Sequence, residues 1–172
     1  MKKVLIVILF LISIGTIATV ILPRTILKAK PVHYHAGFQV YKDGKLQDFS
    51  DFKYMHEKPC TADGKPIEDP NPDEQMEKAH LHDNDGDVVH VHREKARWKD
   101  LFQNIKYPIG ENVTGYVNGK KVDDILDQPI TKDESVIFFI GKNPDETKLL
   151  KKAVTVQRIR EVEKKSETCS AT

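Results

Sequence analysis

The sequence is poor in cysteine, with only Cys60 and Cys169 among its 172 residues. The two lie far apart and form no CxxC pair, so the fold does not depend on a framework of disulfides. In an oxidising compartment they could form one disulfide, and two free thiols are equally compatible with the sequence. No cysteine lies near the end of the N-terminal apolar run, which argues against a bacterial lipoprotein signal.

The sequence also lacks an excess of positive charge. Five of its 27 Lys and Arg residues, and none of its 26 Asp and Glu residues, lie within residues 1–30. The remaining chain therefore has a net charge of −4, which is ordinary for a soluble surface. Because nucleic-acid binding requires a basic surface, we expect no nucleic-acid partner.

Long apolar stretches are missing except for residues 4–22, which follow Met1-Lys2-Lys3 and end before Pro23-Arg24. A helix needs about 20 apolar residues to cross a bilayer, whereas the core of a cleavable signal peptide has about 7–15. We therefore predict an uncleaved anchor, with cleavage as the alternative. Basic residues flank both sides of the run, so the positive-inside rule does not decide its orientation. Signal-anchors usually keep the N-terminus inside, which predicts a single-pass protein of the cell membrane with residues 31–172 outside the cytoplasm.

Turn signals predict three β-hairpins. Asp43-Gly44 joins two short alternating runs within residues 36–48, and Asn118-Gly119 joins two more within residues 113–122. A third hairpin is predicted over residues 79–92, around a turn rich in aspartate. The Pro-rich, acidic stretch between the first hairpin and the third indicates a loop.

The remaining elements predict an α+β fold. Apolar spacing predicts an amphipathic helix over residues 94–105, and the β-rich, apolar run over residues 135–140 predicts a buried central strand. From residue 79 onward the order is strand, strand, helix, strand, strand, which is the order of a β-grasp-like mixed sheet packed on one helix. A C-terminal amphipathic helix is predicted over residues 144–164. The expected organisation is an N-terminal transmembrane helix and basic stem over 1–30, a His-rich domain over 31–142, and a helix and tail over 143–172.

The histidines are the residues whose pattern indicates a metal site. Six of the seven histidines form three His-x-His pairs, and the seventh, His56, is expected to be a loop residue. On a β-strand, residues two apart point to the same face, so each pair can present two imidazoles to one ion. Zinc and copper both accept imidazole nitrogen. We therefore predict a copper or zinc site with the ligands His80, His82, His90, His92, His33 and His35.

The register of the third hairpin decides whether its two pairs can cooperate. If His82 pairs with Val88, then His80 pairs with His90 and all four imidazoles share one face. A slip of one residue would send the two pairs to opposite faces. Hydrogen-bond acceptors that could orient the rings lie in the intervening turn, namely Asp83, Asp85 and Asp87.

Other functions are compatible with the same residues. The aspartate-rich turn resembles a calcium loop, but Leu81 and His92 stand where an EF-hand needs its first carboxylate and its last glutamate. A non-catalytic interaction or assembly subunit of a membrane complex, with structural histidines, is the main alternative. A metal-dependent hydrolase or oxidase is the third. We see no zincin glutamate and no nucleophile motif, so we predict no catalytic residue and no enzyme.

The histidine pattern resembles that of a known group of proteins. Residues 85–92 (Asp-Gly-Asp-Val-Val-His-Val-His) and residues 33–54 are similar to uncharacterised membrane-anchored proteins of archaea and candidate-phylum bacteria with an HxH…GDxIHxH pattern. The resemblance covers most of residues 33–141. It extends to the segment ending at Cys169, where a second nearby cysteine is expected and this chain has none. The resemblance implies a membrane anchor and the histidine pattern, and it implies no reaction.

Overall fold

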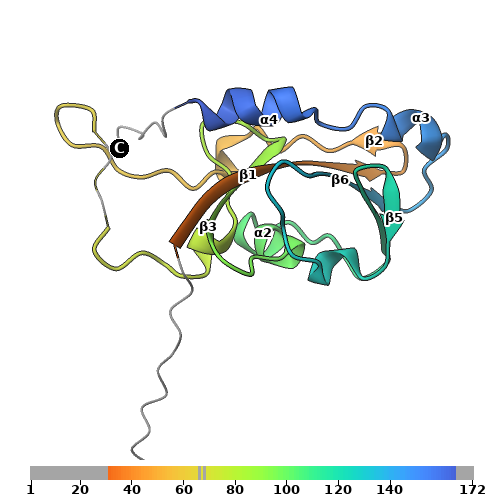
Figure 1. Ribbon diagram of the computed structural model, residues 1–172, viewed down its shortest axis with the longest axis horizontal. Helices are drawn as coiled ribbons and strands as arrows, with labels where there is room; N and C mark the ends of the chain where they lie inside the picture. Colours follow the sequence, from red (N-terminus) through yellow and green to blue (C-terminus); the bar gives the residue numbers. More distant parts are fainter. Residues whose placement is uncertain (1–30, 66, 68, 166–172) are drawn as a thin grey trace, which may run out of the picture.

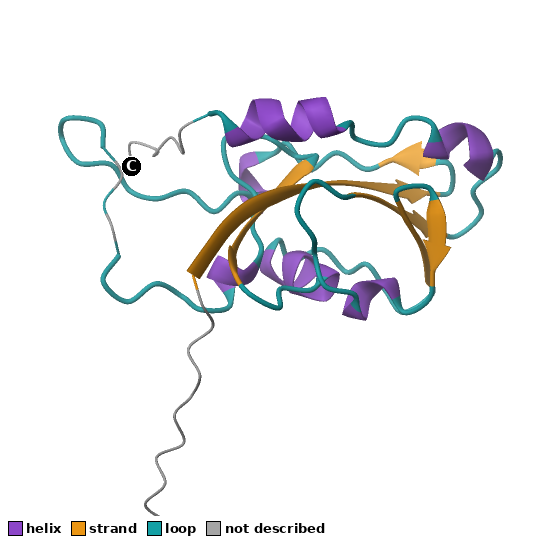
Figure 2. Cartoon of the chain, viewed as in Figure 1, coloured by secondary structure: helices purple, strands orange, loops and turns teal. Residues whose placement is uncertain are grey.

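The computed structural model describes residues 31–65, 67 and 69–165, in which a curved mixed sheet has helices on both faces (Figures 1 and 2). The strands are β1 (Pro31–Lys42), β2 (Lys45–Leu46), β3 (Val88–Arg93), β4 (Val113–Val117), β5 (Lys120–Val122) and β6 (Ser135–Ile140). The helices are α2 (Trp98–Asn104), α3 (Glu146–Leu150) and α4 (Val156–Glu163), with short 3-10 turns η1 (Phe52–Tyr54), η2 (Met76–Lys78) and η3 (Ile125–Asp127).

The long strand β1 is the centre of the sheet. Its first half pairs antiparallel with β3, and its last two residues pair antiparallel with β2. Along its other edge β1 runs parallel to β6, from Gly37 opposite Ser135 to Lys42 opposite Ile140. Strands β4 and β5 complete the sheet beyond β6. β1 therefore connects the end of the sheet that carries the histidines with the rest of the sheet.

One face of the sheet packs on α2. The alternation of β1 places Phe38 and Val40 on this face, where Phe38 contacts Trp98 and Phe102 with ring centroids 6.2 and 6.3 Å apart. Phe138 on β6 packs against the same two α2 rings. These aromatic side chains are buried and form the main hydrophobic core.

The opposite face of β1 packs on α4 (Figure 1). Gly37 allows this close approach, because a Cβ at that position would lie 2.6 Å from Cβ of Val154. Ile159 and Val162 of α4 then pack with Val88 of β3 in a second, smaller cluster. The histidine pairs of β1 and β3 lie on this same face, since residues two apart along a strand share a face.

The fold class predicted from the sequence is wrong on two counts. The sheet packs on α2 and α4 rather than on one helix, and its central strand is β1, whereas the predicted β-grasp-like order was counted only from residue 79 onward. Residues 79–82 form no regular strand; they make single bridges, His80 to His90 and Leu81 to Met55. The segment lies between residue 55 and β3, and it makes too few consecutive backbone hydrogen bonds with either to form a strand.

The predicted transmembrane helix falls on residues that lie outside the described part of the chain. Among the residues described, no helix is long and apolar enough to cross a membrane. The helical elements that are described run to eight residues at most, in α4.

The C-terminal segment over residues 144–164 forms two short helices, not the single helix predicted. The reason is that its apolar side chains pack in two separate places. Leu149 joins the aromatic cluster at the end of β1 and β6, whereas Ile159 packs over β3. Thr155 starts the second helix, its hydroxyl accepting a hydrogen bond from the Arg158 N–H at 3.2 Å.

The predicted tight turns are confirmed. Asp43, Gly44, Asn118 and Gly119 all have φ between 48° and 79°, as a hairpin turn with two left-handed residues requires.

Candidate metal centre

Six histidines lie on one face where three chain segments run side by side. β3 lies in the middle: His90 is opposite His35 of β1 on one side and His80 on the other. The backbone N–H groups of His80 and His90 donate to each other's carbonyl oxygens at 3.0 and 2.9 Å. Directly paired residues of adjacent strands point to the same face, so His80, His90 and His35 form a row across the sheet. Of the two registers that the sequence left open for residues 79–92, the structure therefore has the one in which His80 pairs with His90.

The remaining three imidazoles lie against this row. The ring centroids of His82 and His90 are 3.6 Å apart, and those of His80 and His92 are 5.2 Å apart. His33 contacts His92 at 5.0 Å. All three His-x-His pairs thus contribute to one cluster. The sequence predicted these six histidines as one set of ligands but did not show how they come together in space.

Two groups of three rings are close enough to hold an ion. Within each group, the ring nitrogens lie within 4.8 Å of one another. Two nitrogens bound to one tetrahedral ion at about 2.1 Å are separated by about 3.4 Å, so small ring rotations would complete either site. The inner triad is His35, His82 and His90, and the outer triad is His33, His90 and His92. His90 belongs to both triads, and His80 lies in the cluster but in neither.

The two triads differ in access to solvent. The side chains of the inner triad are buried, with exposures of 1% for His35, 5% for His82 and 2% for His90. In the outer triad His33 is exposed and His92 is half-buried. The cluster therefore extends from the buried interior of the protein to its surface.

His35 and His90 face each other through their Nε2 atoms. Two such nitrogens can share one proton or one cation, but they cannot both carry a proton. Burial, and next the neighbouring His33, lowers the pKa of His35 from 6.5 to about 4. At neutral pH the ring is uncharged, which is the form that binds metal. Its Nδ1 is buried and has no hydrogen-bond partner among the residues described.

His82 is oriented by the adjacent carboxylate. Its Nδ1 donates to Oδ2 of Asp83 at 2.5 Å, while its Nε2 is buried without a hydrogen-bond partner in the described structure. A carboxylate on one ring nitrogen fixes the tautomer and leaves the other nitrogen as a lone-pair donor, as in many metal-bound histidines. Of the three turn aspartates predicted to orient imidazoles, Asp83 therefore does so.

The other two turn aspartates have a different role. Asp85 accepts hydrogen bonds from Arg158 at 2.5 Å and from Lys165 at 2.9 Å, and Asp87 accepts from Arg158 at 2.9 Å. These contacts fasten the aspartate-rich turn to α4. The guanidinium and ammonium groups hold the pKa of the Asp85 carboxyl below its usual range, against the effect of burial.

His80 is fixed by a backbone carbonyl. Its Nδ1 lies 3.0 Å from the Met76 oxygen, which can only accept, so Nδ1 carries the proton and Nε2 carries the lone pair. Burial, and next the charge of His92, lowers the pKa of His80 from 6.5 to about 3. The ring is therefore neutral at physiological pH.

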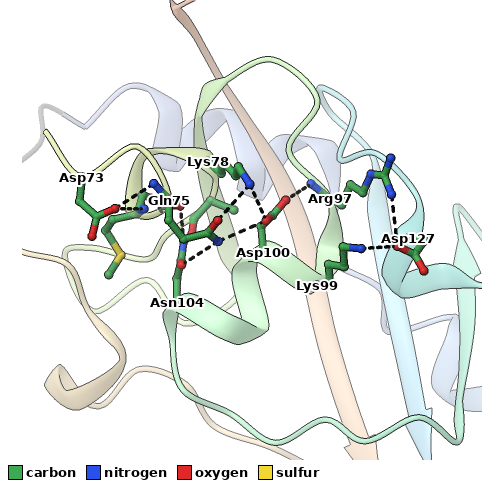
Figure 3. A network of polar contacts seen from close by, with 10 residues as sticks. Asp73, Gln75, Lys78, Arg97, Lys99, Asp100, Asn104 and Asp127 are labelled. Carbon is green, nitrogen blue, oxygen red and sulfur yellow. Dashed lines mark hydrogen bonds and ion pairs between the residues drawn. The ribbon is translucent and has the colours of Figure 1, made fainter. Parts of the chain in front are cut away.

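A polar network connects α2 with the residues around η2 (Figure 3). The amide nitrogen of Asn104 donates to the carbonyl oxygens of Gln75 at 2.8 Å and Ala79 at 2.7 Å. The buried Asp100 accepts from Lys78 at 3.1 Å and from the Arg97 N–H at 2.9 Å, which caps α2. The network joins α2 to the segment that carries His80 and His82.

Sequence reasoning did not assign His56 to the cluster. Its ring centroid lies 5.2 Å from that of His80, and its backbone N–H donates to the Leu81 carbonyl. This proximity depends on a β-bridge between residues 55 and 81, which no local sequence pattern predicts. Cys60, on the loop that follows, is in a disulfide, and the sequence's other cysteine lies outside the described residues.

The donor set consists of imidazole nitrogens. Such a set suits zinc, copper, nickel and ferrous iron, whereas calcium and magnesium prefer oxygen. The chain matches no protein-family model, no curated protein and no solved structure. The functional argument therefore rests on the geometry of the histidine cluster.

Proposed function

We propose that this protein binds a copper or zinc ion at the inner triad, as a non-catalytic metal-binding protein that captures or delivers the ion. The observation that carries the proposal is the convergence of His35, His82 and His90 from three chain segments on one buried point. Buried polar atoms are normally satisfied by hydrogen bonds, yet Nδ1 of His35 and Nε2 of His82 have no partner in the described structure. A bound cation would accept the lone pair of the His82 nitrogen.

The choice between copper and zinc follows from the ligands. Three imidazoles fill three of the four positions of a tetrahedral zinc site. The same set binds copper(II) more tightly, since affinity for nitrogen sites rises toward copper in the first-row series. The predicted membrane tether lies on residues outside the described part, and the proposal depends neither on it nor on the predicted extracytoplasmic location.

Metal analysis of the purified protein tests the proposal. The chain is stripped with a chelator, titrated with Zn²⁺ or Cu²⁺, and assayed for bound metal by calorimetry and elemental analysis. We expect one tightly bound ion per chain, and we expect His82→Ala and His90→Ala to lose it. His56→Ala, which removes an imidazole outside both triads, serves as the matched control and is expected to retain the ion.

Failure to bind either ion would overturn the proposal and favour the alternative of an interaction subunit with structural histidines. Equal loss in His56→Ala and His82→Ala would also contradict it, because the inner triad would then have no special role.

A further inference from the structure

A cavity opens beside the outer triad. It has a volume of about 720 Å³, and His33 and His92 form part of its wall. Since His33 is exposed, the cavity connects the outer triad with solvent. The inner triad lies behind it, buried, with exposures of 5% or less.

The rim of the cavity is acidic. Glu57, Asp69, Asp73 and Glu77 line it, against a single Lys58 among its described lining residues. An excess of carboxylates in a concave surface raises the local concentration of cations and speeds their association at low salt. Glu57 also contacts the site from the other side, accepting a hydrogen bond from the Asp83 N–H at 3.1 Å.

His90 connects the two triads. Because it belongs to both, an ion can move from one to the other while it keeps at least one protein ligand. Burial of the other two inner ligands blocks a direct approach from solvent.

We infer that the outer triad is the port through which the ion reaches the inner triad; this rests on the proposed function. A hydrated divalent cation first exchanges water molecules for His33, His92 and His90. Its bonds to His33 and His92 then break as bonds to His35 and His82 form, with His90 bound throughout. The charge of the ion does not change, and water is the only group released.

The test is the rate of Zn²⁺ uptake by the full chain, followed by stopped flow against a coloured zinc indicator. His33→Ala is expected to slow uptake and release about tenfold, while the amount of zinc bound at equilibrium stays the same. His82→Ala is expected to do the opposite, with fast uptake and weak retention.

Charge variants test the acidic rim. Glu57→Gln removes a charge but keeps the oxygen that accepts from Asp83, and it is expected to slow uptake about twofold and to weaken its salt dependence. Asp127→Asn removes a carboxylate outside the cavity and is the matched control, expected to leave the rate unchanged.

Uptake by His33→Ala at the wild-type rate would overturn the inference and leave the proposed function intact. An equal loss of bound zinc in His33→Ala and His82→Ala would overturn it as well, because the triads would then act as one site. A wild-type protein that takes up no metal would instead defeat the proposed function itself.

Discussion

Acidification is expected to destabilise the metal-free protein because two buried histidines are neutral in the fold. The pKa is about 4 for His35 and about 3 for His80, against 6.5 for an ordinary histidine. Since these folded-state values lie below the unfolded value, the unfolded chain takes up protons first as the pH falls. The stability that these rings contribute is complete above pH 6.5 and is lost as the pH falls toward the folded values.

The magnitude can be worked out for a change from about pH 7.5 to about pH 5. At the lower pH each ring is almost fully protonated in the unfolded chain and almost entirely neutral in the folded one. The free energy of unfolding then falls by about 2 kcal/mol per ring, or about 4 kcal/mol for the two. Ordinary carboxylates titrate near pH 4, so they contribute little in this range. The loss is a large part of the 5–15 kcal/mol that typically stabilises a domain.

The assay is urea unfolding with a chelator present, followed by the fluorescence of Trp98, the single tryptophan, which is buried. The control is the double variant His35→Gln, His80→Gln, whose side chains do not titrate; its loss between the two pH values is expected to fall below about 1 kcal/mol. The reasoning is refuted if the wild type loses less than about 1 kcal/mol, or if the double variant loses as much as the wild type.

Three further results are expected. Zinc or copper at about 100 times its Kd should raise the free energy of unfolding of the wild type by about 2.7 kcal/mol, and should leave His82→Ala unchanged in the same urea assay. Asn104→Ala removes the donor to the carbonyls around η2 and should weaken metal affinity about tenfold in a competition titration, because the segment carrying His82 loosens; unchanged affinity would show that the network does not position it. Gly37→Ala forces a methyl group against Val154 and should cost about 1–3 kcal/mol of stability by urea unfolding, with α4 displaced; full stability would contradict the close packing of α4 on β1.

The sequence by itself determined the local features of this protein. The spacing of two in His80/His82 and in His90/His92 was enough to predict that each pair shares one face. It left two registers open for the pairs, and the His80–His90 bridge shows which of them forms. The Asn118-Gly119 dipeptide likewise predicted the tight turn that the structure has at these residues. These features depend on residues that are neighbours in the chain, so the period of a strand and the chemistry of a turn specify them.

The tertiary structure alone decided which histidines lie close together. His35 meets His90 because β1 pairs with β3, across 55 positions of sequence, and no local pattern fixes that pairing. The break between α3 and α4 could not be predicted from the sequence either. The two helices separate because their apolar side chains pack in two different clusters on the sheet. Burial of the inner triad and exposure of His33 also follow from the packing of distant segments, and that difference leaves one end of the cluster buried and the other at the surface.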